Sequence, residues 1–490
     1  MSESRTSPTQ GDDPKALVNR LLSKAQDAGA QYVDVRVEEV EGTTIRMAQP
    51  DEADIRTYRE GGYSVRALVD GAWGFGAGQD RGQGGVDEVA ARAVFMARAA
   101  AGFTRGPVTL APTPVVTTRW VTPIRKDPFQ VSLNEKVTLL SEALRSMQGR
   151  YVSRRAGILS ESRQQKVFAN SDGSYIEQEL IECGGGLTVF ASRGKEIQRR
   201  TYPGMVFGDV GSQGYEYVEN LDLVHHAPGL AEEAELLLFA EPCPHTVTTI
   251  IIGPRHMALQ VHESAGHPTE LDRVFGYERT LAGGTFLGPE KLGHYRYGSD
   301  LVNITADATV PGGRGTFGFD DEGVPAQRVD LIRDGVFVNY LSSRETAARI
   351  GRASSGAARA DAWNHYPLIR MTNINLEPGE SSVEQMISEV EDGFYFETPR
   401  MWSIDSVRLN FQFGTELGRE IKKGKLGAYI KNPTYTGITP VFWASCDAVG
   451  NKDSWLLTGF ACAKGEPLQF GIRVGHGAPP ARFRNVEIGV

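Results

Sequence analysis

The sequence has few cysteines and no long apolar run, and both absences narrow the class of protein. No stretch approaches the about eighteen consecutive apolar residues of a membrane span, and the polar start MSESRTSPTQGDDP has no signal-peptide core. The four cysteines lie far apart without a C-x-x-C pair, which favours a reducing compartment over a disulfide framework. We therefore expect a soluble, cytoplasmic protein that does not enter a membrane. These cysteines are Cys183, Cys243, Cys446 and Cys462.

The chain also lacks a block of positive charge. Its 52 Lys and Arg residues against 61 Asp and Glu residues give a net charge of -9, and no basic cluster is long enough to attract nucleic acid or anionic lipid. No phosphate-binding G-x-x-x-x-G-K-[ST] motif occurs, and the glycine-rich GFGAG (74–78) follows a predicted hairpin and does not join a strand to a helix. Nucleic acid and nucleotides are therefore not expected as partners.

The 490 residues are too many for one hydrophobic core and predict two or three domains. After a disordered start at 1–13, residues 14–240 mix helical stripes with alternating strands, and a Pro- and Thr-rich connector at 105–128 suggests a subdivision. Residues 244–490 are richer in antiparallel strand and contain a helix expected at 381–393. The predicted fold class is α+β, with a mixed N-terminal domain followed by a C-terminal domain rich in antiparallel β-sheet.

Local signals mark the turns and caps of these elements. Hairpin turns are expected at Asp70-Gly71, Asp172-Gly173, Asp334-Gly335 and Lys423-Gly424, each between two strand-like runs. Ser381 and Glu384 have the spacing of a capping box for the C-terminal helix. The adjacent His225 and His226 are expected on opposite sides of an extended surface segment.

The stretch VHESAGHPTELD (261–272) carries the strongest chemical signal. A buried strand and a Gly253-Pro254 turn precede a predicted helix bearing His262, Glu263 and His267 in an H-E-x-x-x-H pattern. In the familiar H-E-x-x-H motif the two histidines lie one turn apart and face one zinc ion. Five residues of regular α-helix would instead turn the second histidine about 140° away from the first.

A metal site therefore requires the helix to widen or end between the histidines. Gly266 and Pro268 are residues that permit such a change. The alternative is that His262 and His267 are ordinary histidines, one buried and one at a helix end. The pattern by itself leaves both interpretations open.

Longer segments decide between these interpretations through resemblance. HESAGHPTELD, DDEGVPAQRVDLIRDGVFVNYL, HYPLIRMTNINLEPG and CAKGEPLQFGIRVGHGAPPARFRNVEIGV resemble, in order and spacing, the TldD branch of the TldD/PmbA peptidase family. YVDVRVEE and GAWGFG resemble the N-terminal region of the same family, so the similarity extends from about residue 14 to the end.

The resemblance implies a zinc-dependent peptidase with His262, His267 and Cys462 as metal ligands and Glu263 as general base. Two imidazoles and a thiolate leave zinc an open position, as a hydrolytic site requires. Pro268 stands where the family usually has glycine, whereas an acidic pair comparable to Glu270 and Asp272 is kept. The resemblance also implies short or unfolded peptides as substrates and a TldE/PmbA-like paralogue as partner, with a homodimer as the other possibility.

The choice of Cys462 over Cys446 has physical support. The segment before Cys446 is mainly apolar, which is typical of a buried structural cysteine. Cys462 lies among small residues and two positions before Lys464, where a cation favours the thiolate that binds a metal.

Other polar residues are weaker candidates. His365 and Arg370 resemble a family motif and are possible groups for the oxyanion or for a substrate carboxylate, because both can donate to negative charge. Asp320 and Asp321 are either partners of the histidines or turn formers beside a glycine. They belong to the glycine-rich segment 312–323, which is expected to be a mobile loop of the kind that closes over active sites.

Two alternative functions compete with a peptidase. A non-catalytic, peptide-binding subunit similar to the PmbA/TldE branch would lack the metal motif, so the intact His262, Glu263, His267 and Cys462 argue against it. A metal-dependent amide hydrolase of a natural-product or modified-peptide pathway would use the same chemistry on another bond, and the sequence does not separate it from a peptidase.

Overall fold

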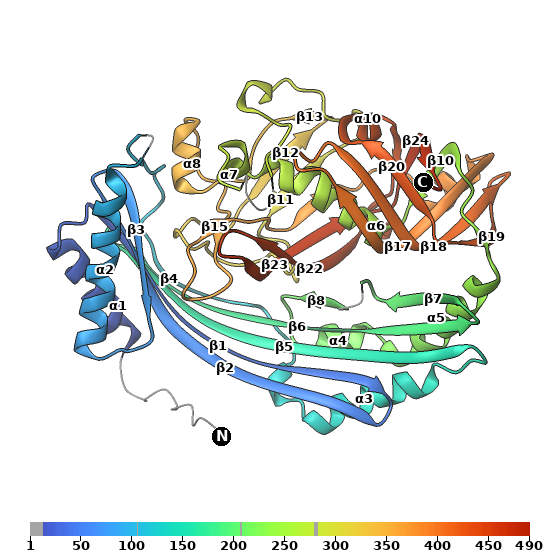
Figure 1. The fold of residues 1–490 in the computed structure, drawn as a ribbon, viewed down its shortest axis with the longest axis horizontal. Helices are drawn as coiled ribbons and strands as arrows, with labels where there is room; N and C mark the ends of the chain where they lie inside the picture. The colour runs from blue at the N-terminus through green and yellow to red at the C-terminus, as the bar shows by residue number, and fades with distance from the viewer. Residues whose placement is uncertain (1–12, 105, 206–207, 279–282) are drawn as a thin grey trace.

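The computed structural model describes residues 13–104, 106–205, 208–278 and 283–490. It confirms the α+β class: a long, curved sheet from the N-terminal half lies beneath the more compact C-terminal half (Figure 1). Of the predicted disordered start, all but Asp13 falls outside the described residues, and the Asp13 side chain caps the first helix.

The N-terminal half consists of two groups of elements. The first group comprises α1 (Pro14–Asp27), β1 (Tyr32–Gln49), β2 (Glu52–Val69), β3 (Ala72–Gly78) and α2 (Gln83–Ala101). The second comprises β4 (Thr117–Val121), α3 (Leu133–Ser146), β5 (Val152–Asn170), β6 (Tyr175–Arg193), β7 (Glu196–Tyr202), β8 (Asp209–Gly211), α4 (Glu216–Asn220) and α5 (Leu223–Phe239).

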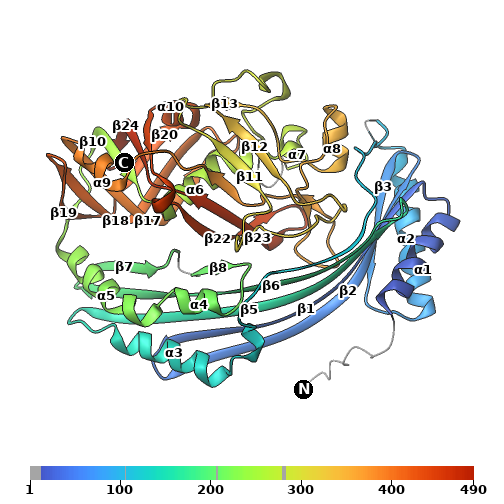
Figure 2. The same ribbon diagram turned by 180° about the vertical axis from the view of Figure 1, so that it is seen from behind.

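These strands form one sheet in the order β3-β2-β1-β5-β6-β4, and β7 and β8 pair with β6. Its long antiparallel strands curve under the C-terminal half, and helices cover the opposite face at both ends (Figure 2). The predicted hairpin turn at Asp70-Gly71 is confirmed. Both residues have a positive φ, of 51° and 76°, as required by a two-residue turn whose twist matches that of its strands. The turn at Asp172-Gly173 is confirmed between β5 and β6.

The C-terminal half contains more and shorter elements. Up to residue 359 they are β9 (Glu241–Pro242), β10 (Thr246–Ile252), α6 (Pro254–Val261), α7 (Leu271–Val274), β11 (Ile304–Asp307), β12 (Arg328–Arg333), β13 (Val336–Phe337), α8 (Arg344–Arg349) and β14 (Ala358–Arg359). The rest are β15 (Leu368–Ile369), β16 (Ile374–Leu376), α9 (Val383–Ser388), β17 (Asp392–Ile404), β18 (Asn410–Lys422), β19 (Lys425–Lys431), β20 (Thr434–Ile438), α10 (Thr439–Ala444), β21 (Cys446–Val449), β22 (Leu456–Lys464), β23 (Gln469–Ala478) and β24 (Ala481–Ile488).

Three sheet layers organise this half around one core. The main sheet has the order β17-β10-β24-β20-β18-β19-β9, with β21 paired to β24, and a smaller sheet has the order β13-β12-β11-β16. β22 and β23 form a hairpin that lies between α6 and the N-terminal sheet (Figures 1 and 2). The predicted hairpin turns at Asp334-Gly335 and Lys423-Gly424 are confirmed.

Buried charges join the two halves. Asp321 of the C-terminal half accepts from Lys166 at 2.6 Å and from Arg36 at 3.2 Å, and both cations project from the N-terminal sheet. The neighbouring Glu322 accepts from Arg66 at 3.2 Å. Because unpaired charges are strongly destabilising in a protein interior, these pairs hold the two halves in one relative position.

Every residue of the segment 312–323, which was expected to be a mobile loop, is buried or half-buried. Asp320 and Asp321 are completely buried. Asp320 accepts from the backbone N–H groups of Glu322 and Val324 at 2.9 Å each, which is the turn-forming role. Asp321 instead pairs with cations of the other half, a role that local sequence does not reveal.

Two local expectations are wrong. His225 and His226 lie in α5, which begins at Leu223, and not in an extended segment, although both are exposed as predicted. Ser382, not Ser381, caps α9 by accepting from the N–H of Gln385, and this helix ends at Ser388 and not at 393. Residues from Asp392 pair with β10 and β18, so sheet pairing overrides the helical pattern there.

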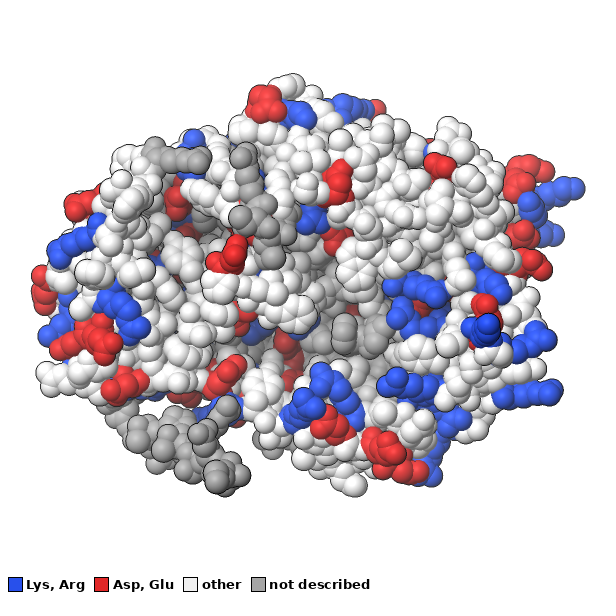
Figure 3. All heavy atoms as spheres, in the orientation of Figure 1, with Lys and Arg blue, Asp and Glu red and all other residues white. Residues whose placement is uncertain are grey.

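Acidic and basic side chains both occur across the face shown in Figure 3, many of them side by side. Within the described ranges, every helix is too short or too polar to cross a membrane.

Candidate metal centre

The helix α6 follows the buried strand β10 and begins with Pro254 after the N-cap Gly253. It then widens into a π-helical turn at His262–Gly266, in which the N–H of His267 donates to the carbonyl oxygen of His262. A π-helical turn closes its hydrogen bond between residues five apart, so His262 and His267 come to one side of the helix. The widening that the five-residue spacing requires is therefore present.

Gly266 and Pro268 fit this turn. A Cβ atom on Gly266 would lie 2.4 Å from the sulfur of Met371, so any larger residue would require this buried side chain to shift. Pro268 lies at the start of the 3-10 turn that follows the second histidine, where its missing N–H is tolerated. The departure at Pro268 is thus compatible with the local helix end.

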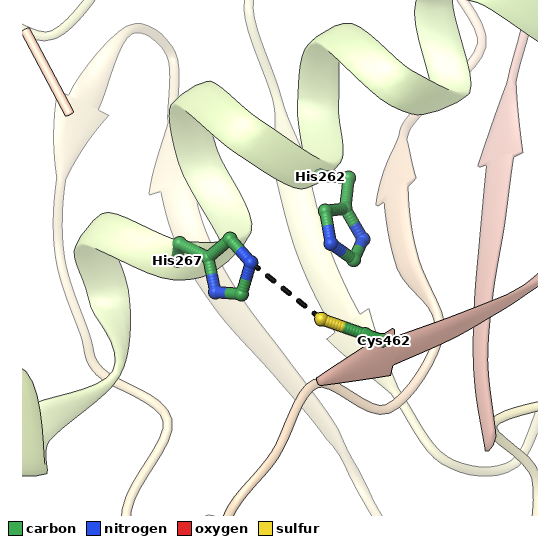
Figure 4. Close-up of side chains that lie close together, drawn as sticks. All are labelled: His262, His267 and Cys462. Carbon is green, nitrogen blue, oxygen red and sulfur yellow. Dashed lines mark hydrogen bonds between the residues drawn. The ribbon is translucent and has the colours of Figure 1, made fainter. Parts of the chain in front are cut away.

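Three side chains meet beside this turn (Figure 4). The ligand atoms of His262, His267 and Cys462 lie within 4.8 Å of one another, and Cys462 Sγ is 3.6 Å from His267 Nε2. Cys462 is on β22, and all three residues are buried. Nitrogen and sulfur are the types of donor atom that zinc accepts.

A third histidine, His476, orients the imidazole of His262. His262 Nδ1 lies 2.7 Å from His476 Nε2, and His476 Nδ1 lies 3.2 Å from the carbonyl oxygen of Ile374. Because a carbonyl only accepts, His476 carries its proton on Nδ1, and its Nε2 accepts from His262. His262 therefore keeps the lone pair of Nε2 for a metal.

A carboxylate orients His267 in the same way. Glu270 Oε2 lies 2.9 Å from His267 Nδ1 and also accepts from Arg273 Nε at 2.6 Å. Burial would raise the pKa of Glu270, but Lys464, Arg273 and His267 hold it well below its usual range. Glu270 is therefore an acceptor. Arg273 Nη2 also lies 3.2 Å from His267 Nδ1, but the carboxylate contact is shorter, so we assign the proton to Nδ1 and the free lone pair to Nε2, facing Cys462.

Burial keeps the imidazoles neutral. It lowers the pKa of both His262 and His267 to about 4. Burial alone would raise the pKa of Cys462, but Arg370 and His267 lower it to about 7. Neutral imidazoles and an acidified thiol are the protonation states that bind a metal.

Glu263 lies beside the cluster without belonging to it. Its Oε2 accepts from Arg408 Nη1 at 2.7 Å, and its side chain is 8% exposed.

Of the other candidate residues, Arg370 interacts with the three-residue cluster, whereas His365 and Cys446 lie outside it. Arg370 is 1% exposed and acts electrostatically on both Cys462 and His262. His365 instead lies 2.5 Å from Asp361 through its Nδ1 and is not in the three-residue cluster. Cys446 is buried on β21, with its Sγ 3.7 Å from the carbonyl oxygen of Ala448, and also lies outside the cluster.

Sequence reasoning did not find His476, Arg408 or Arg273. His476 lies in the closing segment that resembles the family, where a histidine between two glycines of β23 was the available signal. Arg408 precedes β18 with a φ of 66°, and nothing in its neighbouring sequence connects it with Glu263.

A buried histidine pair and cysteine beside a glutamate, on an α+β scaffold, are the features of a metal-dependent hydrolase. Three family models match the chain: the PmbA/TldA metallopeptidase domain 1 at residues 33–97, the central domain at 126–235 and the C-terminal domain at 245–490. The chain belongs to the PmbA/TldA metallopeptidase family. It is therefore a metalloprotease, a hydrolase, and the predicted family is confirmed.

Individual relatives extend over nearly the whole chain. It is 31% identical to a metalloprotease of Synechocystis sp., over 97% of this chain and 98% of the relative. It is 23% identical to a protein of Saccharolobus solfataricus named zinc metalloprotease TldD homolog, over 96% of this chain and 99% of that protein.

Solved structures share the fold at low sequence identity. One is a putative modulator of a DNA gyrase from Thermotoga maritima, with a TM-score of 0.77 and 18% identity, covering 97% of this chain and 100% of that one. TldE from Thermococcus kodakarensis has a TM-score of 0.71 and 17% identity, covering 97% of this chain and 100% of that one.

Proposed function

We propose that the protein is a zinc-dependent peptidase that binds its metal through His262, His267 and Cys462. The observation that carries the proposal is the convergence of these three ligand atoms within 4.8 Å. The Nδ1 atoms of both imidazoles already have partners, so the free lone pairs on Nε2 belong to the convergent atoms.

The donor set fits zinc and a hydrolytic role. Two nitrogens and one sulfur are ligands that zinc accepts, and three protein ligands leave a fourth position for substrate or water. A bound zinc would lower the pKa of water and polarise a peptide carbonyl. One curated relative is itself named a zinc metalloprotease.

Glu263 is the proposed general base. It follows His262 directly on the π-helical turn, and its charge interacts with that imidazole. Arg408 orients this carboxylate through the contact at 2.7 Å. Glu263 would take a proton from water and return it to the leaving amine, and no nucleophilic serine or cysteine is needed.

We further propose short or unfolded peptides as substrates and a cytoplasmic hetero-oligomer with a TldE-like paralogue as the working form. Support for the partner comes from the structural similarity to a protein named TldE. Support for a reducing compartment comes from the four cysteines, all free in the structure.

Purification followed by metal analysis tests this function. The protein, with and without the co-expressed paralogue, is assayed for zinc by mass spectrometry and against a peptide library. We expect chelators to abolish cleavage and Glu263→Ala to remove it while zinc stays bound. Glu384→Gln, at an exposed position of α9, is the matched control. Near-wild-type turnover of Glu263→Ala at full zinc occupancy would refute the general base.

A further inference from the structure

Two arginines share one face of the β14–β15 ladder. Arg359 pairs with Leu368, and Ala358 pairs with Ile369. The N–H of Arg370 then donates to the carbonyl oxygen of Ala357 at 2.8 Å, which continues the same register. Opposite residues, and residues two apart on one strand, point to the same side. Arg359 and Arg370 are therefore diagonal neighbours on that side.

Both guanidinium groups are buried, and neither forms an ion pair within the part of the chain that the structure describes. Arg359 is 8% exposed and Arg370 is 1% exposed. Among the described residues, Arg359 Nε and Arg370 Nε and Nη1 have no hydrogen-bond partner. The Arg359 guanidinium also donates to the carbonyl oxygen of Met371 and lies over the Phe317 ring, 5.1 Å from its centroid. Buried cations are normally paired, so two neighbouring unpaired ones indicate a place for an anion.

Mutual repulsion of the two arginines supports this conclusion. Burial and the positive charge of Arg370 lower the pKa of Arg359 to about 9, although Asp321 opposes the shift. An anion held by both side chains would relieve the repulsion and replace the lost hydration.

Arg359 faces a cavity between the two halves of the chain. The cavity has a volume of about 50 Å³, and Lys166, Arg314 and Arg473 also line it. Lys166 is paired with Asp321 at 2.6 Å, and Arg314 and Arg473 share Glu182 at 3.2 and 3.5 Å. Among the described residues that line the cavity, Arg359 is thus the cation without an ion pair, and the one acidic side chain there, Asp361, is paired with His365. The space exceeds that of one water molecule, which needs roughly 10–15 Å³ by the same measure, and suits a carboxylate.

Arg370 connects this wall with the metal centre. Lys464, two residues after Cys462 on β22, donates to the carbonyl oxygen of Ile369 at 2.9 Å, which holds β15 against the strand of the metal ligand. A ligand bound by both arginines would therefore lie next to the cluster.

We propose that Arg359 and Arg370 bind a carboxylate of the substrate, namely the free C-terminal carboxylate of a short peptide. The inference rests on the proposed peptidase function and narrows its substrates to peptides that present this anion near the metal. An internal Asp or Glu side chain offers the same chemistry, and substrate design separates the two sources.

The first experiment compares three acetylated peptides of equal length. One has a free C-terminal carboxylate, one a C-terminal amide, and one the amide plus an internal Glu. With the zinc-loaded protein we expect kcat/KM at least tenfold higher for the free acid than for the plain amide, mainly through KM. Arg359→Gln should bring this ratio close to one, Arg359→Lys should restore part of it, and Arg333→Gln, an exposed control, should retain it.

The second experiment measures binding without turnover. Metal-free protein is titrated calorimetrically with acetyl-trialanine as acid and as amide, and the acid should bind at least tenfold more tightly. Equal binding and equal cleavage of acid and amide would overturn the inference and leave the peptidase proposal standing. If neither the acid nor the amide were cleaved, the peptidase proposal would be contradicted. The calorimetric comparison of acid and amide binding would still decide the inference. If the Glu-containing amide and the free acid had equal kcat/KM, the C-terminal assignment would be wrong and the bound group would be a side-chain carboxylate.

Discussion

Cys462 Sγ lies 3.6 Å from His267 Nε2, although 195 residues separate them in the chain. One residue is on the β22–β23 hairpin and the other ends the π-helical turn (Figure 4). The cluster thus depends on how this hairpin packs against α6, and its ligands are assembled by tertiary contacts.

Cysteine substitutions test which thiol binds the metal. Cys462→Ser should lose most bound zinc and most activity, because a hydroxyl replaces the thiolate that the metal prefers. Cys446→Ser should keep its zinc with a modest loss of stability, because Cys446 packs in the core outside the cluster. Zinc content of the two purified variants is the measurement, and the reverse pattern would refute the assignment.

His476→Ala should weaken zinc binding roughly 10–100-fold, the usual effect of removing a group that orients a metal ligand. Without His476 the Nδ1–H of His262 loses the acceptor at 2.7 Å. Competition with a chromophoric chelator measures the affinity. His245→Ala, which alters an exposed histidine, is the control. Equal affinities in the two variants would show that His476 does not orient the ligand.

Gly266→Ala should destabilise the protein by about 1–3 kcal/mol, the typical range for overpacking a core. The added methyl would lie 2.4 Å from Met371 Sδ. Gly229→Ala in α5 is the matched control, because nothing lies within 4 Å of its Cβ position. Denaturant unfolding measures both, and a combined Gly266→Ala, Met371→Ala variant should show coupling between the two sites. Additive effects would contradict the proposed clash.

Glu182 should contribute to stability at neutral pH and lose that contribution in acid. Burial opposes its ionisation, but Arg314 and Arg473 lower its pKa from 4.5 to about 2. A carboxyl with a lowered folded-state pKa stabilises the fold above pH 4.5, and the contribution falls as pH drops toward 2. The shift corresponds to about 3 kcal/mol.

Urea unfolding of Glu182→Gln at pH 7 and pH 3 measures this contribution. The variant should be less stable than the wild type at pH 7, and the difference should shrink at pH 3. Glu52→Gln, at an exposed position of β2, should have the same stability as the wild type at pH 7 and at pH 3. A difference that is independent of pH would exclude the ionised pair as its cause.

Much of the local structure was predictable because its causes are local. Asp-Gly and Lys-Gly pairs adopt the left-handed backbone that two-residue hairpins need, so the turns at Asp70-Gly71 and Lys423-Gly424 were correctly placed. The capping pattern around Ser381 failed by one residue and the helix ended early, because pairing of β17 with β10 and β18 decided where the chain became extended.

The sequence by itself determined the family, the H-E-x-x-x-H spacing of His262 and His267, and the need for a widened helix between them. Only the tertiary structure decided that His476 and Glu270 orient these histidines, that Arg408 contacts Glu263, and that Asp321 binds cations of the other half. The physical reason is that spacing and turn chemistry act between neighbours in the chain. Buried polar partners are instead chosen by which strands and helices pack together, across separations that no local pattern records.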